Sequence, residues 1–401
     1  MTHKKSILFP LLLVLYEIAT YLSNDMYLPA LPDMMKDLSL TPQVAQSTLT
    51  TWFVGTAILP LLMGILSDQY GRRSVLLIGG VFYILATIMC ALATNSSSLL
   101  IFRFIQGASI PSMMVAGYAC VHELYDQKEA IRILALMSSI TILAPALGPL
   151  LGSILLFFTS WRGIFWFIAI LSTLAIAALF KWMPETYSPE KRVPLDLVTL
   201  FKQYGRILIN PRFMLLLCVL GFIFAGFIVW IAAGSLLVIQ NFKYSPFAFG
   251  IIQALIFATY IYGNHQVKYL LEWMNINKLI WLGLAITLLG GMLILMFAMF
   301  SPNNLILFLI AMAIYSLGSA LCFAPLNRMI IEASDEPMSL RVGLFTVLWT
   351  AFGVLGSLIA SFYFDGTIRS IAYPITDTII ISCLLMAVAG KINTKPTVDK
   401  L

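Results

Sequence analysis

Long apolar runs alternate with short polar turns along this sequence. A helical run of about 20 residues, rising about 1.5 Å per residue, spans the ~30 Å hydrocarbon core of a bilayer. The pattern therefore predicts twelve membrane-spanning helices. Their expected ranges are 7–29, 45–66, 75–94, 98–120, 131–156, 162–181, 212–238, 245–266, 279–300, 304–329, 342–363 and 373–391.

The composition leads to the same fold class. Hydrophobic residues make up 60% of the chain and charged residues 10%, whereas soluble domains carry roughly 25% charged residues. The first apolar run has a basic start but contains two acids and no small-residue cleavage site, so it is expected to be a retained helix. We predict an all-α integral membrane protein.

The longest loop carries three prolines among charged residues and divides the spans six and six. We expect an N-terminal six-helix bundle at 1–181, a cytoplasmic loop at 182–211 and a C-terminal six-helix bundle at 212–401. Transporters with this arrangement relate their halves by a pseudo-two-fold axis along the membrane normal. Within the loop, the segment 201–209 has helical spacing of apolar residues between basic ones, which predicts a short surface helix.

Charge then sets the orientation. Most of the 24 lysines and arginines lie on the side of the two termini, so the positive-inside rule predicts cytoplasmic termini. The net charge of +6 reports this topology and requires no nucleic-acid partner.

A polar stripe runs along the first predicted span. On a helical wheel, Glu17, Tyr21, Asn24 and Asp25 project into one arc of about 100°. The two acids are about 12 Å apart along the axis. Because a charge inside the membrane is costly and usually functional, the stripe favours a substrate path. The alternative is that each acid makes a structural hydrogen bond to a neighbouring helix.

Arg103 lies inside the fourth predicted span. It is near enough to the span's outer end to reach the headgroups, but the following Gln106 and Gly107 indicate a close polar contact between helices. We therefore favour a functional role for this arginine.

Other ionisable residues are expected nearer the ends of the spans. Asp377 and Arg328 fall close to the ends of the ranges given above, and His122 with Glu123 ends span four. The last two are expected to be interfacial.

The turn after the second span reads GxxxDxxGRR. Its residues are Gly64, Asp68, Gly71, Arg72 and Arg73. Glycine permits a tight turn, and the acid can cap a helix or pair with a base.

The fifth span contains two prolines and a GxxxG pair: Pro145, Gly148, Pro149 and Gly152. The prolines kink the helix, and the glycines form a face for close packing.

Together these motifs resemble those of the major facilitator superfamily, and in particular its twelve-helix drug/proton antiporters. The resemblance covers nearly the whole chain. It rests on the segments 64–73, 103–107, 144–152 and 184–186, on Leu15 to Glu17, Tyr21 and Asn24 to Met26 of span one, and on Gly250 to Gln253 and Gly263-Asn264 of span eight.

The resemblance implies roles for these residues. Asp25 would be the site where protons and cationic substrate compete, Glu17 a second recognition acid and Arg103 a coupling group. Asp68 with Arg72 would form a conformational latch. It also implies a bacterial inner-membrane location.

We expect the substrate site to be lined by the span-one stripe, by Gln253 and by Trp230. The predicted function is proton-coupled efflux of lipophilic cationic and neutral small molecules. The partners are those substrates, protons and membrane lipids, with no cofactor or metal, and the protein is expected to be a monomer.

Two other classes of function are disfavoured. No catalytic or metal-binding motif indicates an enzyme, and the second half offers too few deep charges for a continuous polar pore. The alternative that stays open is a dedicated exporter or importer of one metabolite, such as a siderophore or sugar.

Overall fold

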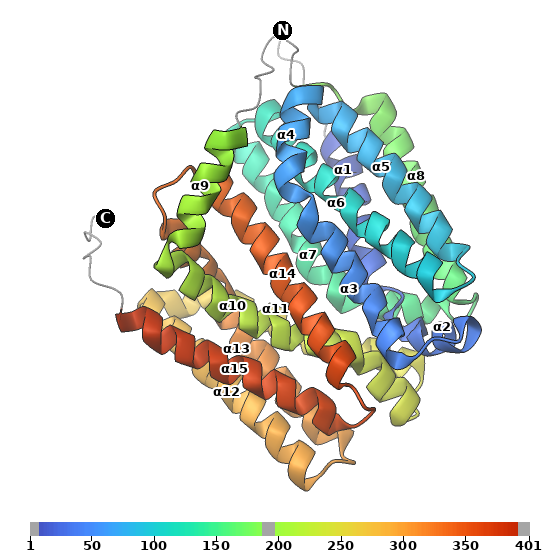
Figure 1. Ribbon diagram of the computed structural model, residues 1–401, viewed down its shortest axis with the longest axis vertical. Helices are drawn as coiled ribbons and strands as arrows, with labels where there is room; N and C mark the ends of the chain where they lie inside the picture. Colours follow the sequence, from blue (N-terminus) through green and yellow to red (C-terminus); the bar gives the residue numbers. More distant parts are fainter. Residues whose placement is uncertain (1–7, 187–196, 392–401) are drawn as a thin grey trace. The chain divides into compact units, whose positions relative to one another are not determined.

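A computed structural model of the protein describes residues 8–186 and 197–391, and all regular secondary structure in that part is helical (Figure 1). The ends of the chain and residues 187–196 of the predicted central loop lie outside the described residues. The helices are α1 (Leu8–Asp25), η1 (Leu28–Ala30), α2 (Leu31–Leu38), α3 (Pro42–Ile58), α4 (Pro60–Tyr70), α5 (Arg72–Ala91), α6 (Ser96–Leu124), α7 (Gln127–Leu155), α8 (Trp161–Trp182), α9 (Leu197–Ile209), α10 (Pro211–Ser235), η3 (Leu236–Asn241), α11 (Pro246–Trp273), α12 (Ile276–Phe300), α13 (Leu305–Glu332), α14 (Met338–Tyr363) and α15 (Ile368–Lys391).

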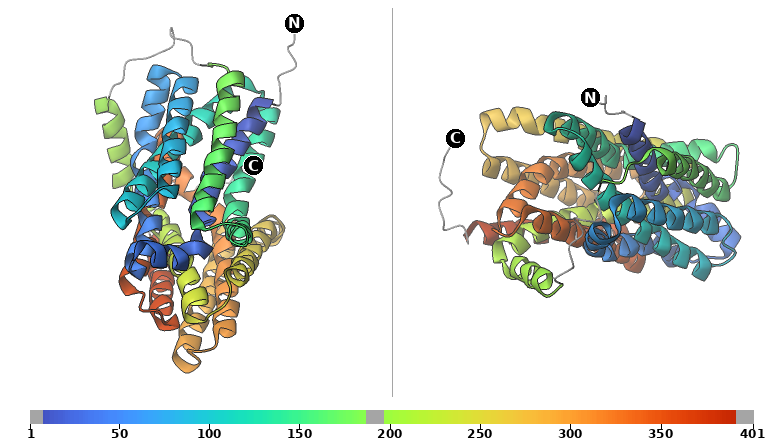
Figure 2. Two further views of the ribbon diagram at one scale, coloured as in Figure 1. Left: turned by 90° about the vertical axis from the view of Figure 1, so that its right-hand side faces the viewer. Right: turned by 90° about the horizontal axis from the view of Figure 1, so that it is seen from above.

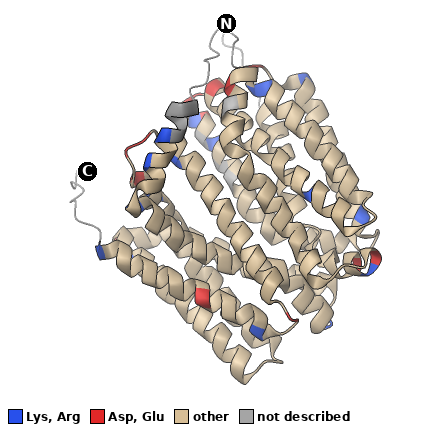
Figure 3. Ribbon diagram, viewed as in Figure 1, with Lys and Arg blue, Asp and Glu red and all other residues tan. Residues whose placement is uncertain are grey.

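Eleven segments of the described chain are long and apolar enough to cross a membrane. One of them joins α3 and α4, which meet at Pro60, where proline removes a helix hydrogen bond. The remaining predicted span is α1, whose polar face makes it less apolar than the others. Charged positions gather at helix ends and leave long uncharged stretches between them (Figure 3). The all-α membrane fold is confirmed, and the eleven segments together with α1 are consistent with twelve spans.

The chain forms two compact units. Unit 1 consists of Met1–Leu195 and Ala232–Phe257, and unit 2 of Asp196–Ile231 and Ala258–Leu401. Helices α10 and α11 therefore contribute to both units. The three-part division at 182–211 stays a prediction.

Unit 1 is built around two sets of packed helices. α5 and α6 lie side by side in every view (Figures 1 and 2), and α3 packs on α6. α1 packs against α7 and α8, so its polar stripe is enclosed by protein.

Within unit 2, hydroxyl groups on one helix donate hydrogen bonds to backbone carbonyls of another. α12 and α13 pack along their length, and α15 packs on α12. Thr376 donates to the carbonyl of Gly291 at 2.8 Å, and Ser382 to that of Val219 at 2.8 Å. Tyr315 donates to the carbonyl of Ile223 at 2.9 Å. Such bonds join helices where no water can replace them.

The structure corrects the expected depth of Asp377. α15 begins at Ile368, five residues before the predicted start, so Asp377 is its tenth residue. The neighbouring Thr376 bonds Gly291, which lies in the middle portion of α12. Asp377 is exposed on the surface of α15. Asp377 therefore lies well inside its helix, although the sequence placed it near a span end.

The amphipathic segment of the central loop forms α9, as predicted. Tyr204 and Ile207 are buried, whereas Lys202 and Arg206 are exposed. Arg206 pairs with Glu336 at 3.2 Å within unit 2.

Candidate functional site

The polar stripe of α1 faces the interior of unit 1. Glu17 is completely buried, Asp25 is 1% exposed and Asn24 is 8% exposed, while Tyr21 is half-buried. The helical spacing therefore predicted correctly which residues share this enclosed face.

Each acid of the stripe has one oxygen that accepts a hydrogen bond and one that does not. Tyr118 of α6 donates to Oε1 of Glu17 at 2.6 Å. Asn24 donates to Oδ1 of Asp25 at 3.0 Å. In the described part of the chain, Oε2 of Glu17 and Oδ2 of Asp25 have no hydrogen-bond partner. Both carboxylates thus retain capacity for a proton or a cation.

The GxxxG face of α7 lies directly against Asp25. A Cβ atom at Gly148 would be 3.0 Å from Cβ of Asp25, and one at Gly152 would be 1.7 Å from the carbonyl oxygen of Met26. Only glycine permits this approach of two backbones. The structure thus brings the motif at 144–152, with Pro145 and Pro149 inside the helix, to the acid at the end of α1.

Arg103 is completely buried and joins three helices. Its guanidinium donates to the carbonyl of Ser23 at 2.8 Å, to that of Thr48 at 3.2 Å and to Oε1 of Gln106 at 2.6 Å. It also lies over the ring of Tyr27, 4.5 Å from its centre. Burial excludes the alternative in which this side chain reaches the headgroups. Arg103 instead makes the close polar contact between helices that the sequence predicted.

Gln106 extends this network to a fourth helix. Its amide donates to the hydroxyl of Thr87 on α5 at 2.8 Å. No carboxylate of the described chain forms an ion pair with Arg103. The positive charge of Arg103 is therefore held by carbonyl dipoles and a ring face.

The other two predicted substrate-site residues lie in different units. Gln253 of α11 belongs to unit 1 and is completely buried. Trp230 of α10 belongs to unit 2, where it is buried against Phe308 with ring centres 5.8 Å apart. Their place in one substrate site stays a prediction.

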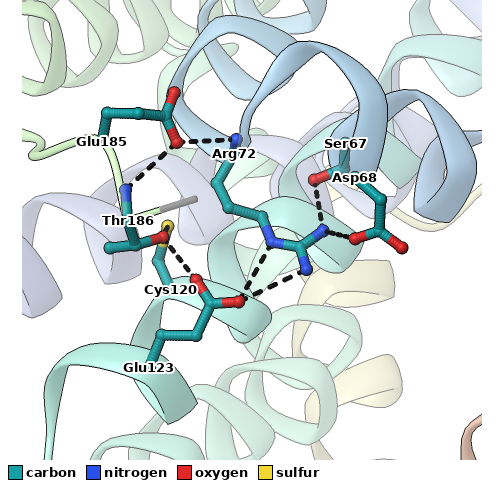
Figure 4. Close-up of polar contacts among 7 residues, drawn as sticks. All are labelled: Ser67, Asp68, Arg72, Cys120, Glu123, Glu185 and Thr186. Atoms are coloured by element: carbon teal, nitrogen blue, oxygen red, sulfur yellow. Dashed lines mark hydrogen bonds and ion pairs between the residues drawn. The ribbon is translucent and has the colours of Figure 1, made fainter. Parts of the chain in front are cut away.

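The turn from Gly64 to Arg73 forms a polar cluster at the junction of α4 and α5 (Figure 4). Asp68 and Arg72 form an ion pair at 2.5 Å, and Ser67 accepts from Arg72 at 2.9 Å. Arg73 points elsewhere and donates to the carbonyl of Phe180 at 2.5 Å. A Cβ atom at Gly64 would have its nearest neighbour, Cγ1 of Val115, 4.0 Å away, so no close approach requires glycine there. The acid and the first arginine are thus the residues of this motif that pair.

Three residues from outside the 64–73 motif complete the cluster. Glu123 of α6 accepts from Nε and Nη2 of Arg72, each at 3.3 Å. Glu185 accepts from the backbone N–H of Arg72 at 3.0 Å, and Thr186 donates to Glu123. Glu123 was expected to be interfacial, and it does lie at the end of α6, but its pairing with Arg72 was not predicted. The signal that pointed to the others was the segment 184–186 directly after span six.

Comparison with known proteins decides the family. The family model described as "Major Facilitator Superfamily" matches residues 13–389. The chain belongs to the major facilitator superfamily.

Relatives in this superfamily include drug transporters. The chain is 34% identical to the multidrug transporter MdfA of Edwardsiella ictaluri, over 88% of this chain and 86% of that protein. It is 28% identical to the chloramphenicol resistance protein CraA of Acinetobacter baumannii, over 90% and 87%. A solved nucleoside transporter, NupG, shares the fold with a TM-score of 0.72 at 14% identity, over 96% of this chain and 100% of the other.

Superfamily membership confirms the class of function. The protein is a multi-pass membrane transporter of the bacterial inner membrane and not an enzyme. Its relatives place it among multidrug efflux transporters of the superfamily.

Proposed function

We propose that this protein exports lipophilic cationic and neutral small molecules in exchange for protons, by alternating access. The observation that carries the proposal is the enclosed pair of acids on α1, each with one oxygen that has no hydrogen-bond partner among the described residues. The names of the relatives support the substrate class, because one set is called multidrug transporters and another a chloramphenicol resistance protein.

Proton exchange follows from the cost of a buried charge. An ionised carboxylate without full hydrogen bonding is strongly disfavoured away from water. Asp25 is also the last residue of α1, where the helix carbonyls carry partial negative charge and disfavour a second one. Asp25 is therefore neutral while the site is empty. A lipophilic cation favours the ionised form and displaces the proton, so that the two occupants exclude each other.

Glu17 is the second recognition acid in this proposal. Its hydrogen bond from Tyr118 stabilises the carboxylate, and it lies about 12 Å along the helix from Asp25. It assists cation binding without carrying the exchanged proton. A neutral substrate does not require either acid to ionise.

Arg103 acts as the coupling group. Its hydrogen bonds go to Ser23, Thr48 and Gln106, so they persist whether or not Asp25 is protonated. A fixed positive charge lowers the cost of ionising Asp25 when its proton leaves. The arginine thus keeps the free-energy difference between protonated and ionised Asp25 small enough for a proton and a cation to exchange there.

The cluster around Arg72 acts as a conformational latch, at a distance from the acids of α1. Ion pairs of this kind alter the relative free energies of two conformations when they are made in only one of them. The termini are cytoplasmic by the distribution of lysine and arginine, and the transporter works as a monomer.

The proposal is tested with purified protein in liposomes carrying an imposed pH gradient. We expect lipophilic cations to be transported against the direction of proton flow, neutral drugs to compete with them, and organic acids to have no effect. Selective transport of one sugar or siderophore, with no response to lipophilic cations, would favour the single-metabolite alternative.

A further inference from the structure

The chain folds back onto the latch immediately after α8. Glu185 and Thr186 bring two side chains and a backbone N–H to the start of α5 and the end of α6 (Figure 4). Neither residue touches the acids of α1. Their position next to Arg72 therefore calls for a role in the latch itself.

Glu185 caps α5 from outside the helix. Its Oε1 accepts from the backbone N–H of Arg72 at 3.0 Å and from that of Thr186 at 3.1 Å. The residue before the helix, Gly71, has a φ of +95° and no side chain to do this. A Cβ atom there would lie 2.5 Å from Oε2 of Glu185. The glycine of the motif thus makes room for a carboxylate that supplies both the cap and the negative charge favoured at a helix start.

Thr186 orients the carboxylate on the other side of Arg72. Its hydroxyl donates to Oε2 of Glu123, while Oε1 of Glu123 faces the guanidinium of Arg72. The thiol of Cys120, one turn earlier on α6, lies 3.4 Å from the same hydroxyl and is completely buried. Since the hydroxyl donates to Glu123, the thiol is the donor in this contact.

We infer that Glu185 and Thr186 are positioning residues for the latch: they fix Arg72 between Asp68 and Glu123 and so set how readily the latch opens. The inference rests on the proposed transport function. Glu185 holds the backbone of Arg72, and Thr186 holds the acid that binds its guanidinium. The segment that leads out of span six is thereby joined to the turn after span two, so a displacement of either one disturbs the ion pair.

Matched variants separate positioning from simple structural support. Thr186→Val removes the hydroxyl at nearly constant shape, and Thr186→Ser retains it. Glu185→Gln keeps an acceptor oxygen, and Glu185→Ala removes it. Loss of a charge-assisted hydrogen bond shifts an equilibrium by about tenfold or more. We expect Thr186→Val and Glu185→Ala to lower the rate of transport by about tenfold while the affinity for tetraphenylphosphonium changes by less than about twofold. Thr186→Ser should keep most of the rate.

Reactivity of Cys120 supplies a readout that does not require transport. In a variant whose only cysteine is Cys120, labelling by a membrane-permeable maleimide should be about tenfold faster with Thr186→Val or Glu185→Ala than without them. A second single-cysteine variant that keeps Cys90, buried elsewhere on α5, should show no change. Adding Glu185→Ala to Asp68→Asn should give no further increase, because both act on one cluster.

The inference requires both results. Equal loss of binding and transport, or labelling of Cys120 that Thr186→Val leaves unchanged, would overturn it. If the protein does not move lipophilic cations at all, the proposed function fails while the labelling results still decide the role of Glu185 and Thr186.

Discussion

The ionisable groups of the two units differ in burial. In unit 1, Glu17, Asp25 and Arg103 are enclosed by protein, and the hydrogen bonds of Glu17, Arg103 and Gln106 link four helices. In unit 2, Asp377 lies well inside α15 but on an exposed helix surface. Burial thus distinguishes the enclosed acids of α1 from an acid on an exposed helix surface.

Unit 2 offers aromatic rings where unit 1 offers charges. The indole of Trp349 stacks on Phe224 with ring centres 4.0 Å apart, and it also contacts Phe323 and Phe345. Trp349 and Phe224 are half-buried. The comparison leads us to expect that unit 1 handles protons and that unit 2 supplies adaptable apolar surface.

The largest effect is expected at Asp25. Asp25→Asn mimics the protonated acid permanently, so cation transport driven by a pH gradient should fall by at least about a hundredfold. A neutral drug should still bind. In the wild type, cation affinity should rise with pH, because ionised Asp25 is the form that a cation selects. Binding titrations at several pH values measure neutral-drug binding and the pH dependence of cation affinity. A cation affinity that does not change with pH would contradict the assignment of Asp25 as the exchange site.

Arg103 should be the residue of unit 1 whose replacement most reduces stability. Arg103→Lys keeps the charge but loses the planar set of donors that reaches Ser23, Thr48 and Gln106. Breaking one partner of a buried charged network costs on the order of 3 kcal/mol. The melting temperature in detergent should fall clearly. An unchanged melting temperature would show that the network contributes little to folding.

Asp68→Asn tests the latch. It removes the ion pair with Arg72 but leaves the α1 acids untouched. Transport should fall by about tenfold, since the ratio of conformations shifts by about 1.4 kcal/mol, with binding affinity nearly unchanged. Parallel loss of transport and binding would instead place Asp68 in the substrate site.

Asp377→Leu should raise the stability of the protein, whereas replacement of Arg103 in unit 1 should lower it. We expect the exposed surface of α15 to face lipid, where an acid near the middle of a span costs roughly 2.5–3.5 kcal/mol on insertion scales. Leucine should therefore stabilise the protein and leave transport intact. Asp25→Leu is the matched control and should abolish cation transport. Loss of transport in Asp377→Leu would show that exposure does not separate the two kinds of acid.

The smallest effect is expected at Asp37, at the end of α2. Hydrogen bonds from Arg162 and Trp161 hold the pKa of Asp37 below its usual value. A lowered pKa stabilises the fold above the unfolded pKa of about 4, and this contribution is lost as pH falls through the folded value. The melting-temperature difference between wild type and Asp37→Asn should therefore shrink in acid. A constant difference would exclude titration of Asp37 as its cause.

Hydropathy was sufficient to predict the spans, because the length of an apolar run is a local property. It missed the break at Pro60, the 3-10 turn after Asp25 and the π-helical turn η3 (Leu236–Asn241), since these depend on individual hydrogen bonds. It also set α15 five residues short, which misplaced Asp377.

Some residues of the candidate site could likewise be predicted from local sequence patterns, and others could not. The stripe on α1 follows from helical periodicity, so its members were predictable. The contacts of Arg72 with Glu123 and Glu185 join positions 51 and 113 residues apart, and no local spacing encodes them. The approach of α7 to Asp25 likewise becomes visible only when the helices are packed.

Proton exchange at Asp25 is tested most directly by measuring proton release from detergent-solubilised protein on addition of tetraphenylphosphonium. The wild type should release protons, Asp25→Asn should release none, and Glu17→Gln should still release them with a weaker affinity for the cation. Undiminished release from Asp25→Asn would contradict proton exchange at Asp25 and move the exchange site elsewhere, with Glu17 as the next candidate.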